Sequence, residues 1–205
     1  MHINYTDVVS RRSQITSRVP MRYTPGRSWE SVRERRVLSL GCGPVEGSQF
    51  KELLASAAGV EGVDTDPKTG ALYRTLAEVP SGEFTSLVAE HVLEHMTHGQ
   101  MLDAFEQAAR ILSPGSTVII TLPNINNFGI WFGDYDHKSF CPPVDTASML
   151  ELHGFHVTDM FGWSKPSRYQ RLLAMGDQER ALCAFMEANW GLTLPQYITI
   201  CAVRI

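Results

Sequence analysis

The sequence lacks the features that mark several large classes of protein. Its four cysteines, at positions 42, 141, 183 and 201, lie far apart and form no C-x-x-C pair, which disfavours a disulfide framework or a cysteine-ligated zinc site. No apolar run approaches the length of about 18 residues that a membrane-spanning helix needs. The N-terminus, MHINYTDVVSRRSQ, lacks the apolar core of a signal peptide. We therefore expect a cytoplasmic protein with reduced thiols.

An excess of basic charge is also missing. The chain has 18 Lys and Arg against 22 Asp and Glu, a net charge of -4 and a pI of about 6.0. This balance disfavours nucleic acid and anionic membranes as partners. Arginines do gather near the N-terminus, where residues 1–34 are predicted to be an arm, or short helices packed on the edge of a domain formed by residues 35–205. A solvated, loosely ordered arm is the favoured interpretation, and an arm that contacts a phosphate or a substrate stays open.

What the sequence does contain is a regular alternation of short apolar runs with helical repeats. At 205 residues the chain is long enough for one domain with a sizeable core. Alternating strands and helices predict an α/β fold with a mostly parallel sheet covered on both faces. We expect strands in RVLSL, GVEGVD, TSLVAEH, STVIITLP, FHVTDMFGWS and QYITICAVRI, a short strand in GALYRTLAEVPSG, and helices after GCGPVEG and in GQMLDAFEQAARIL, TASMLELHG and DQERALCAFMEANW. Asp145 is the expected N-cap of the helix TASMLELHG.

A glycine-containing turn, SLGCGPVEG, follows the first of these strands. Gly41 and Gly43 allow backbone angles and close ligand approach that other residues resist. About 20 residues later Asp64 ends the next strand, where a carboxylate can accept hydrogen bonds from both hydroxyls of a ribose. A tight strand–helix turn, with Asp64 as a surface cap, is the alternative.

With these segments in order, the chain resembles the class I S-adenosylmethionine-dependent methyltransferases. The similarity is to the small-molecule branch related to the ubiquinone-biosynthesis enzymes, and it covers residues 37–160 and, more loosely, the C-terminal strands. The matching segments are VLSLGCGPVEG, GVDTDP, FTSLVAEHVLEHM, ARILSPGSTVIITLPN and HKSFCPPVDTASMLELHGFHV. The resemblance implies a Rossmann-like doubly wound sheet with an antiparallel C-terminal strand.

The resemblance also implies S-adenosyl-L-methionine as cofactor and a set of residues around it. The glycine turn would line the methionine and ribose portion, and the carboxylate after the second strand would hold the ribose hydroxyls. Thr65 would lie near the adenine and Glu90 near the sulfonium, whose charge a carboxylate favours. The cofactor residues assigned in this way are Ser39, Gly41, Cys42, Gly43, Asp64, Thr65 and Glu90.

Three positions depart from the family pattern. Ser39 stands where the family usually has the acidic residue that holds the cofactor's amino group, and Glu46 or Glu90 is a possible substitute. Val45 stands where a third glycine is common, and Thr85 replaces the usual Asp. The alternative function is accordingly a non-catalytic, methyltransferase-like binding protein.

The stretch AEHVLEHM contains His91, Glu94 and His95, which read H-x-x-E-H. This spacing is the signature of one zinc peptidase class, so a metal-dependent hydrolase is a further, less favoured alternative. Some methyltransferase branches, the ubiquinone-pathway O-methyltransferases and the small-RNA 2'-O-methyltransferases, bind a divalent ion with a similar E-x-x-E-H pattern, and the RNA enzymes add a histidine comparable to His137. The favoured interpretation is that Glu94 and His95 position a short helix after the strand. A metal is possible but not favoured, and no metal ligand is assigned.

For catalysis we expect methyl transfer to a small-molecule acceptor, at a hydroxyl. His95 and His137 are the predicted catalytic residues, because histidine can accept a proton near neutral pH. The loop of residues 124–143 is the expected acceptor cover, and its Trp131, Phe132, Tyr135 and Phe140 either stack on the acceptor or cap the sheet edge. Trp163 and residues 165–192 are expected to complete the pocket. The sequence gives neither the acceptor nor the oligomeric state.

Overall fold

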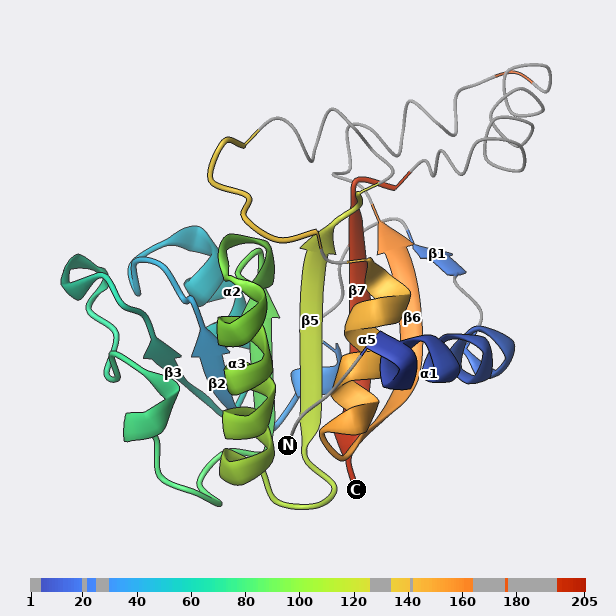
Figure 1. Cartoon of the computed structure of the whole chain (residues 1–205). Coiled ribbons are helices and arrows are strands. Elements are labelled where there is room, and N and C mark those ends of the chain that lie inside the picture. Colours follow the sequence, from blue (N-terminus) through green and yellow to red (C-terminus); the bar gives the residue numbers. More distant parts are fainter. Residues whose placement is uncertain are drawn as a thin grey trace.

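The computed structural model describes residues 5–19, 22–24, 30–125, 134–140, 142–163, 176 and 195–205. Its centre is a seven-stranded sheet in the order β1-β6-β7-β5-β4-β2-β3 (Figure 1). The strands are β1 Arg22–Thr24, β2 Arg36–Leu40, β3 Gly59–Val63, β4 Ser86–Glu90, β5 Thr117–Pro123, β6 Phe155–Trp163 and β7 Tyr197–Arg204.

All strands but one run in the same direction. β3, β2, β4 and β5 pair in parallel, and β7 pairs antiparallel with both β5 and β6. The predicted doubly wound, mostly parallel sheet with an antiparallel C-terminal strand is therefore confirmed. The carboxyl ends of the parallel strands meet at one edge, the upper one in Figure 1, and ligands bind at this edge in such sheets.

The described α-helices are α1 Tyr5–Arg18, α2 Ser48–Ser56, α3 His98–Ile111 and α5 Pro143–Leu152, and the short 3-10 helices are η1 Glu30–Val32, η2 Pro67–Thr69, η3 Leu76–Glu78 and η4 Leu93–His95. Local chemistry fixes the start of α3. Thr97 accepts a hydrogen bond from the backbone of Gln100, whose side chain accepts one from the Thr97 backbone, so two N–H groups at the helix start are satisfied. Among the described helices, none has the length and apolarity that a membrane span requires.

Alternation along the strands divides the core between the two faces of the sheet. Val37, Val88 and Ile119 lie on one face and pack with Leu53 of α2. Their immediate neighbours in sequence point to the opposite face, where they meet the buried residues of α1, α3 and α5. Because both faces of β2, β4 and β5 are covered, these strands are buried along their whole length apart from Arg36, and most of their residues are apolar.

The N-terminal region is more ordered than a solvated arm. α1 lies across α5 in Figure 1, and Arg12 and Arg18 form ion pairs with Asp145 and Glu151 of that helix. β1 extends the sheet by pairing in parallel with β6. The expectation of a loosely ordered arm is therefore wrong for residues 5–19. The division of the chain at residue 34 stays a prediction.

Two local predictions also need correction. α5 begins at Pro143, so Asp145 lies inside its first turn, and its side chain binds Arg12 rather than capping the helix. The segment GALYRTLAEVPSG holds a single bridge between Tyr73 and Val63 and the 3-10 helix η3, and not a strand. The predicted helix DQERALCAFMEANW lies outside the described residues.

Candidate cofactor and acceptor site

A cleft opens at the carboxyl ends of β2 and β4. Its volume of about 350 Å³ lies within the range of roughly 300–1,000 Å³ typical of small-molecule sites. The cleft combines a glycine-rich backbone wall with a buried carboxylate and an imidazole. It is lined by Gly41, Cys42, Gly43, Pro44, Gly47, Phe50, Glu90 and His91.

The turn after β2 requires glycine at two positions for different reasons. Gly41 has a φ of +59°, and a Cβ there would lie 2.5 Å from a methyl carbon of Val92, so any side chain would clash. Gly43 has the same φ, but a Cβ there would meet nothing within 4 Å. Gly41 therefore lets the turn pack against the segment after β4, whereas Gly43 leaves backbone open to the cleft.

Asp64, which directly follows β3, holds this turn in place through a hydrogen bond to Gly43. One carboxylate oxygen accepts a hydrogen bond from the Gly43 N–H and the other from the Asp66 N–H, each at 2.9 Å. Each oxygen keeps a further lone pair, so the same carboxylate can still accept hydrogen bonds from a diol. Thr65, predicted to lie near the adenine, directly follows Asp64 and is exposed.

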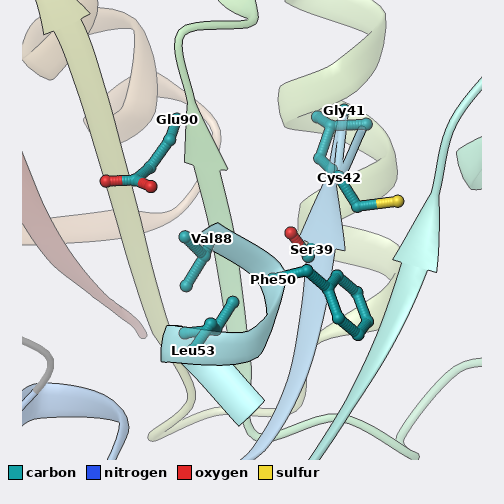
Figure 2. Close-up of a pocket in the computed structure, with 8 residues that line it drawn as sticks. Ser39, Gly41, Cys42, Phe50, Leu53, Val88 and Glu90 are labelled. Carbon is teal, nitrogen blue, oxygen red and sulfur yellow. The ribbon is translucent and has the colours of Figure 1, made fainter. Parts of the chain in front are cut away.

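A smaller cavity continues below the cleft and contains the predicted residues Ser39 and Glu90. Ser39 lies between Glu90 on one side and Gly41 and Cys42 on the other (Figure 2). Both Ser39 and Glu90 are buried, at 8% and 7% exposure. Glu46, the other residue considered as a substitute for the missing acid, is exposed. The family's acidic position is thus occupied by a hydroxyl, with a carboxylate on the neighbouring strand.

Cys42 turns its sulfur away from Glu90 and toward β3 (Figure 2). A Cβ on Gly62 of β3 would lie 2.5 Å from this sulfur, so the two residues interlock. Burial, and then the negative charge of Asp64, raise the pKa of the Cys42 thiol to about 11. The thiol is therefore neutral at physiological pH and serves packing rather than nucleophilic chemistry.

His91 is a cleft residue that the sequence did not assign to the cofactor site. Its φ is +56°, which is uncommon for a residue other than glycine, and strain of this kind concentrates at functional sites. Its ring packs edge-on against Tyr197 with centroids 4.7 Å apart, and its Nδ1 lies 3.4 Å from Oε1 of Glu94. Its place directly after a buried strand was the available signal, because that position falls at the ligand-binding edge.

The two predicted catalytic histidines lie together, beside the cleft lining rather than in it. The ring centroids of His95 and His137 are 5.0 Å apart, and His95 Nδ1 is 3.1 Å from the carbonyl oxygen of Asp136. A peptidase-type H-x-x-E-H site requires both histidines on one α-helix, whereas His91 has a left-handed φ and precedes the short helix η4. The metal-dependent hydrolase interpretation therefore does not hold.

An aromatic wall adjoins His91 on the side of β7. Tyr197 packs against Trp163 with ring centroids 4.7 Å apart, and the Trp163 Nε1–H donates a hydrogen bond to Thr199. Of the predicted cover loop, Tyr135 and Phe140 are exposed, and Trp131 and Phe132 lie outside the described residues. Residues 165–192, apart from Gly176, lie outside them as well.

Taken together, the glycine turn, the carboxylate that follows the next strand and the cleft that the glycine turn lines are typical of an α/β protein that binds a nucleotide-containing cofactor. Comparison with known proteins agrees. The family model described as "Methyltransferase domain" matches residues 11–160, which is well over half of the chain. The chain therefore belongs to this methyltransferase-domain family. No curated protein matches its sequence.

Solved structures share the fold at low sequence identity. A SAM-dependent methyltransferase from Archaeoglobus fulgidus has a TM-score of 0.67 at 18% identity, covering 96% of this chain and 94% of that chain. The [4+2]-cyclase SpnF has a TM-score of 0.56 at 17% identity, with coverages of 97% and 81%. Geranyl diphosphate C-methyltransferase from Streptomyces coelicolor A3(2) has a TM-score of 0.56 at 12% identity, with coverages of 96% and 80%.

These findings confirm a class I S-adenosylmethionine-dependent methyltransferase, with S-adenosyl-L-methionine as its cofactor. The residues present fit that cofactor. The backbone at Gly43 is open where a ligand can approach, and Glu90 and Asp64 provide carboxylates at two points of the same edge. The closer likeness to ubiquinone-biosynthesis enzymes, and the role of each residue, stay predictions.

Proposed function

We propose that the protein transfers a methyl group from S-adenosyl-L-methionine to a hydroxyl of a small molecule. The observation that carries this proposal is the cleft itself, in which an open glycine backbone, a buried carboxylate and His91 face one space. The acidic charge balance favours a small acceptor over a nucleic acid. The Streptomyces coelicolor enzyme, which acts on geranyl diphosphate, is an example of this fold with a small acceptor.

Each of the predicted cofactor residues has a role in this proposal. Asp64 accepts hydrogen bonds from the ribose hydroxyls while it continues to hold the Gly43 N–H. Glu90 and the Ser39 hydroxyl receive the amino group, so the carboxylate on β4 replaces the acid that β2 lacks. Gly41, Cys42 and Gly43 provide the backbone wall, and Thr65 borders the adenine.

The bound cofactor supplies an electrophilic methyl carbon on a sulfonium. The protein's contribution is mainly to orient the acceptor oxygen in line with that carbon and to remove its proton. When bound, the cofactor would supply the methyl group that the acceptor oxygen takes up, with S-adenosylhomocysteine as the leaving group, and the hydroxyl proton would pass to an imidazole nitrogen. We assign this proton transfer to the pair His95 and His137, and the contact with the acceptor's apolar part to the Tyr197–Trp163 wall.

Calorimetric titration with S-adenosylhomocysteine tests the cofactor part of the proposal. We expect wild-type protein to bind one equivalent at micromolar concentration, and Asp64→Ala to bind at least tenfold more weakly because the ribose loses its acceptor. Asp66→Ala is the matched control, since this neighbouring carboxylate caps η2 and accepts from Lys68. Equal affinity in wild type and Asp64→Ala would remove Asp64 from the site.

A non-catalytic binding protein is the second candidate function, and the hydroxyl at Ser39 is the observation that favours it. This candidate predicts weak or absent binding of S-adenosylhomocysteine in the same titration. SpnF also shows that a protein of this fold can be named for an activity other than methyl transfer. If binding is micromolar, the non-catalytic interpretation loses its support and a screen of small hydroxylated acceptors becomes the next step.

A further inference from the structure

The side chain of Glu94 is the least expected feature of the molecule. It is 1% exposed, and neither carboxylate oxygen has a hydrogen-bond partner among the described residues. A buried carboxylate without a donor is costly, because its oxygens have lost their hydration and gained no hydrogen bond in exchange. The Nδ1 atom of His91, at 3.4 Å from Oε1, lies within ion-pair distance but does not form a hydrogen bond. The geometry calls for a cation at this carboxylate.

Two histidines complete a set of ligands around that carboxylate. One ligand atom each from Glu94, His95 and His137 lie within 4.8 Å of one another. A carbonyl oxygen can only accept, so the contact of 3.1 Å between His95 Nδ1 and the Asp136 carbonyl fixes the proton on Nδ1. The neutral ring then carries its lone pair on Nε2. This pattern, in which one ring nitrogen donates to a carbonyl, is typical of histidines that bind metals.

The backbone holds the three residues in place without the metal. The carbonyl oxygen of Glu94 accepts hydrogen bonds from the N–H groups of Lys138 at 2.7 Å and Ser139 at 3.1 Å. The Ser139 hydroxyl donates to the carbonyl of Met96 at 2.6 Å. These bonds fix the segment that carries His137 to the short helix that carries Glu94 and His95. A ligand set built on such a frame is preorganised rather than accidental.

We propose that Glu94, His95 and His137 bind a divalent transition-metal ion, with zinc as the best match. Two imidazoles and one carboxylate suit zinc better than magnesium, and three protein ligands leave a coordination position open. The ligand set differs from the H-x-x-E-H motif, because His91 stands outside it. His91 instead approaches Glu94 from the cleft side, where it can orient the carboxylate.

The role of the ion rests on the proposed methyl transfer, whereas the binding site does not. The open position would take the acceptor hydroxyl, and the ion would lower the pKa of this hydroxyl so that its proton can leave to water. When the ion is bound, the ion would activate the acceptor hydroxyl in place of proton transfer to His95 or His137, which would then serve as ligands. His91 lines the cleft and lies beside Glu94, so it would hold the cofactor cleft and the metal site in a fixed relative position.

Cobalt titration of the chelator-treated full chain tests the site directly. We expect one equivalent of Co²⁺ to bind, with the visible absorption of a low-coordinate site, and zinc to displace it. His137→Ala and Glu94→Gln should each weaken cobalt binding at least tenfold. His98→Ala is the matched control, since this exposed histidine lies in the next helix, and it should bind cobalt like the wild type. Absence of stoichiometric cobalt binding, or binding unchanged in both ligand variants, would overturn the proposal.

Two further measurements keep the outcomes separate. S-adenosylhomocysteine titration of His137→Ala should give wild-type affinity, which shows that the variant is folded. If the wild-type protein binds S-adenosylhomocysteine but not cobalt, the metal site is refuted; if it binds cobalt but not S-adenosylhomocysteine, the proposed function is refuted. Thermal unfolding provides a second criterion. Without metal, Glu94→Gln should unfold at a higher temperature than wild type, because a buried carboxylate without a hydrogen-bond partner has been removed. With zinc the order should reverse, and an order that is the same in both conditions would contradict the metal site.

Discussion

At the scale of single residues, Gly41 joins fold and site most directly. Its positive φ turns the chain after β2, and its missing Cβ leaves room for Val92, which follows β4. A Cβ added at position 41 would clash with Val92 and would also change the wall of the cleft, which Gly41 lines. The position therefore constrains stability and cofactor binding together.

Replacement of Gly41 by Ala should affect both properties. The left-handed backbone alone costs about 1–3 kcal/mol in a residue with a Cβ, and the contact at 2.5 Å to Val92 adds displacement of the segment after β4. We expect denaturant unfolding to show a loss in that range or above it, and calorimetry to show at least tenfold weaker binding of S-adenosylhomocysteine.

The matched control is Gly59→Ala at the start of β3, where a Cβ meets nothing within 4 Å. This variant should unfold within about 0.5 kcal/mol of wild type, as surface substitutions usually do. Equal stability and affinity for Gly41→Ala and Gly59→Ala would contradict the role given to Val92.

Residue-scale prediction from sequence worked where one residue decides the local chemistry, and failed where a distant contact decides it. Gly41 was predictable as a turn residue because only glycine tolerates such a turn. The ribose-binding role of Asp64 stays a prediction. His91 was not predictable as a strained cleft residue. Its backbone N–H binds the Thr121 carbonyl and its ring binds Tyr197, and neither contact is encoded nearby in the sequence.

At the scale of elements, the ion pairs between α1 and α5 join the N-terminal helix to the sheet domain. Glu151 is buried, with 4% of its side chain exposed, and it binds Arg18 while Arg11 lies 3.6 Å away. The Val157 N–H donates to the same carboxylate at 3.2 Å. The carboxylate thus ties α1, α5 and β6 together at one point.

Glu151→Gln should loosen this junction. Breaking a buried ion pair costs about 3–5 kcal/mol when a charge is left buried. Here the arginines that remain are more than a third exposed and can return to water, so we expect a smaller loss of about 1–3 kcal/mol. Urea unfolding followed by circular dichroism measures it. Glu106→Gln, an exposed change on α3, is the control, and a loss no greater than that of the control would show that the ion pairs of Glu151 do not help to hold α1.

The elements that the sequence predicted are those with their own hydrophobic pattern. The apolar runs of β2, β4 and β5 and the helical repeat of α3 were identifiable because each carries the periodicity of its final structure. β1 was not predicted because three residues are too few to show a hydrophobic pattern. The strand forms by pairing with β6, where Arg22 lies opposite Phe161. Asp145 was misread as a cap because its partner, Arg12, lies far away in the sequence.

At the scale of the whole molecule, the cofactor cleft is built from the centre of the fold. The turn after β2, the end of β4 and α2 all contribute to its lining, and β2, β4 and α2 also form the core on one face of the sheet. A ligand that binds there requires the folded sheet, so its binding free energy should add to the stability of the entire domain rather than of one loop.

The unfolding temperature should therefore rise when S-adenosylhomocysteine binds, and unfolding should remain a single transition. A ligand at about 100 times its dissociation constant stabilises the folded state by about 2.7 kcal/mol, and about 2–4 °C per kcal/mol applies to a chain of this size. We expect an increase of about 5–10 °C, measured by scanning calorimetry. Asp64→Ala at the same ligand concentration should show a clearly smaller increase. A full increase in that variant would mean that the ligand binds elsewhere.

The position of β7 has a consequence for synthesis of the protein. Among the strands that the structure describes, β7 alone joins β5 to β6, so this sheet consists of two separate parts until residues 197–204 are available. While the ribosome is still making residues 164–196, β5 presents an open edge of buried, apolar residues that another nascent chain could pair with. A premature stop before residue 197 would make that exposure permanent. In the cell, such fragments should be substrates for chaperones and proteases rather than partly active enzymes.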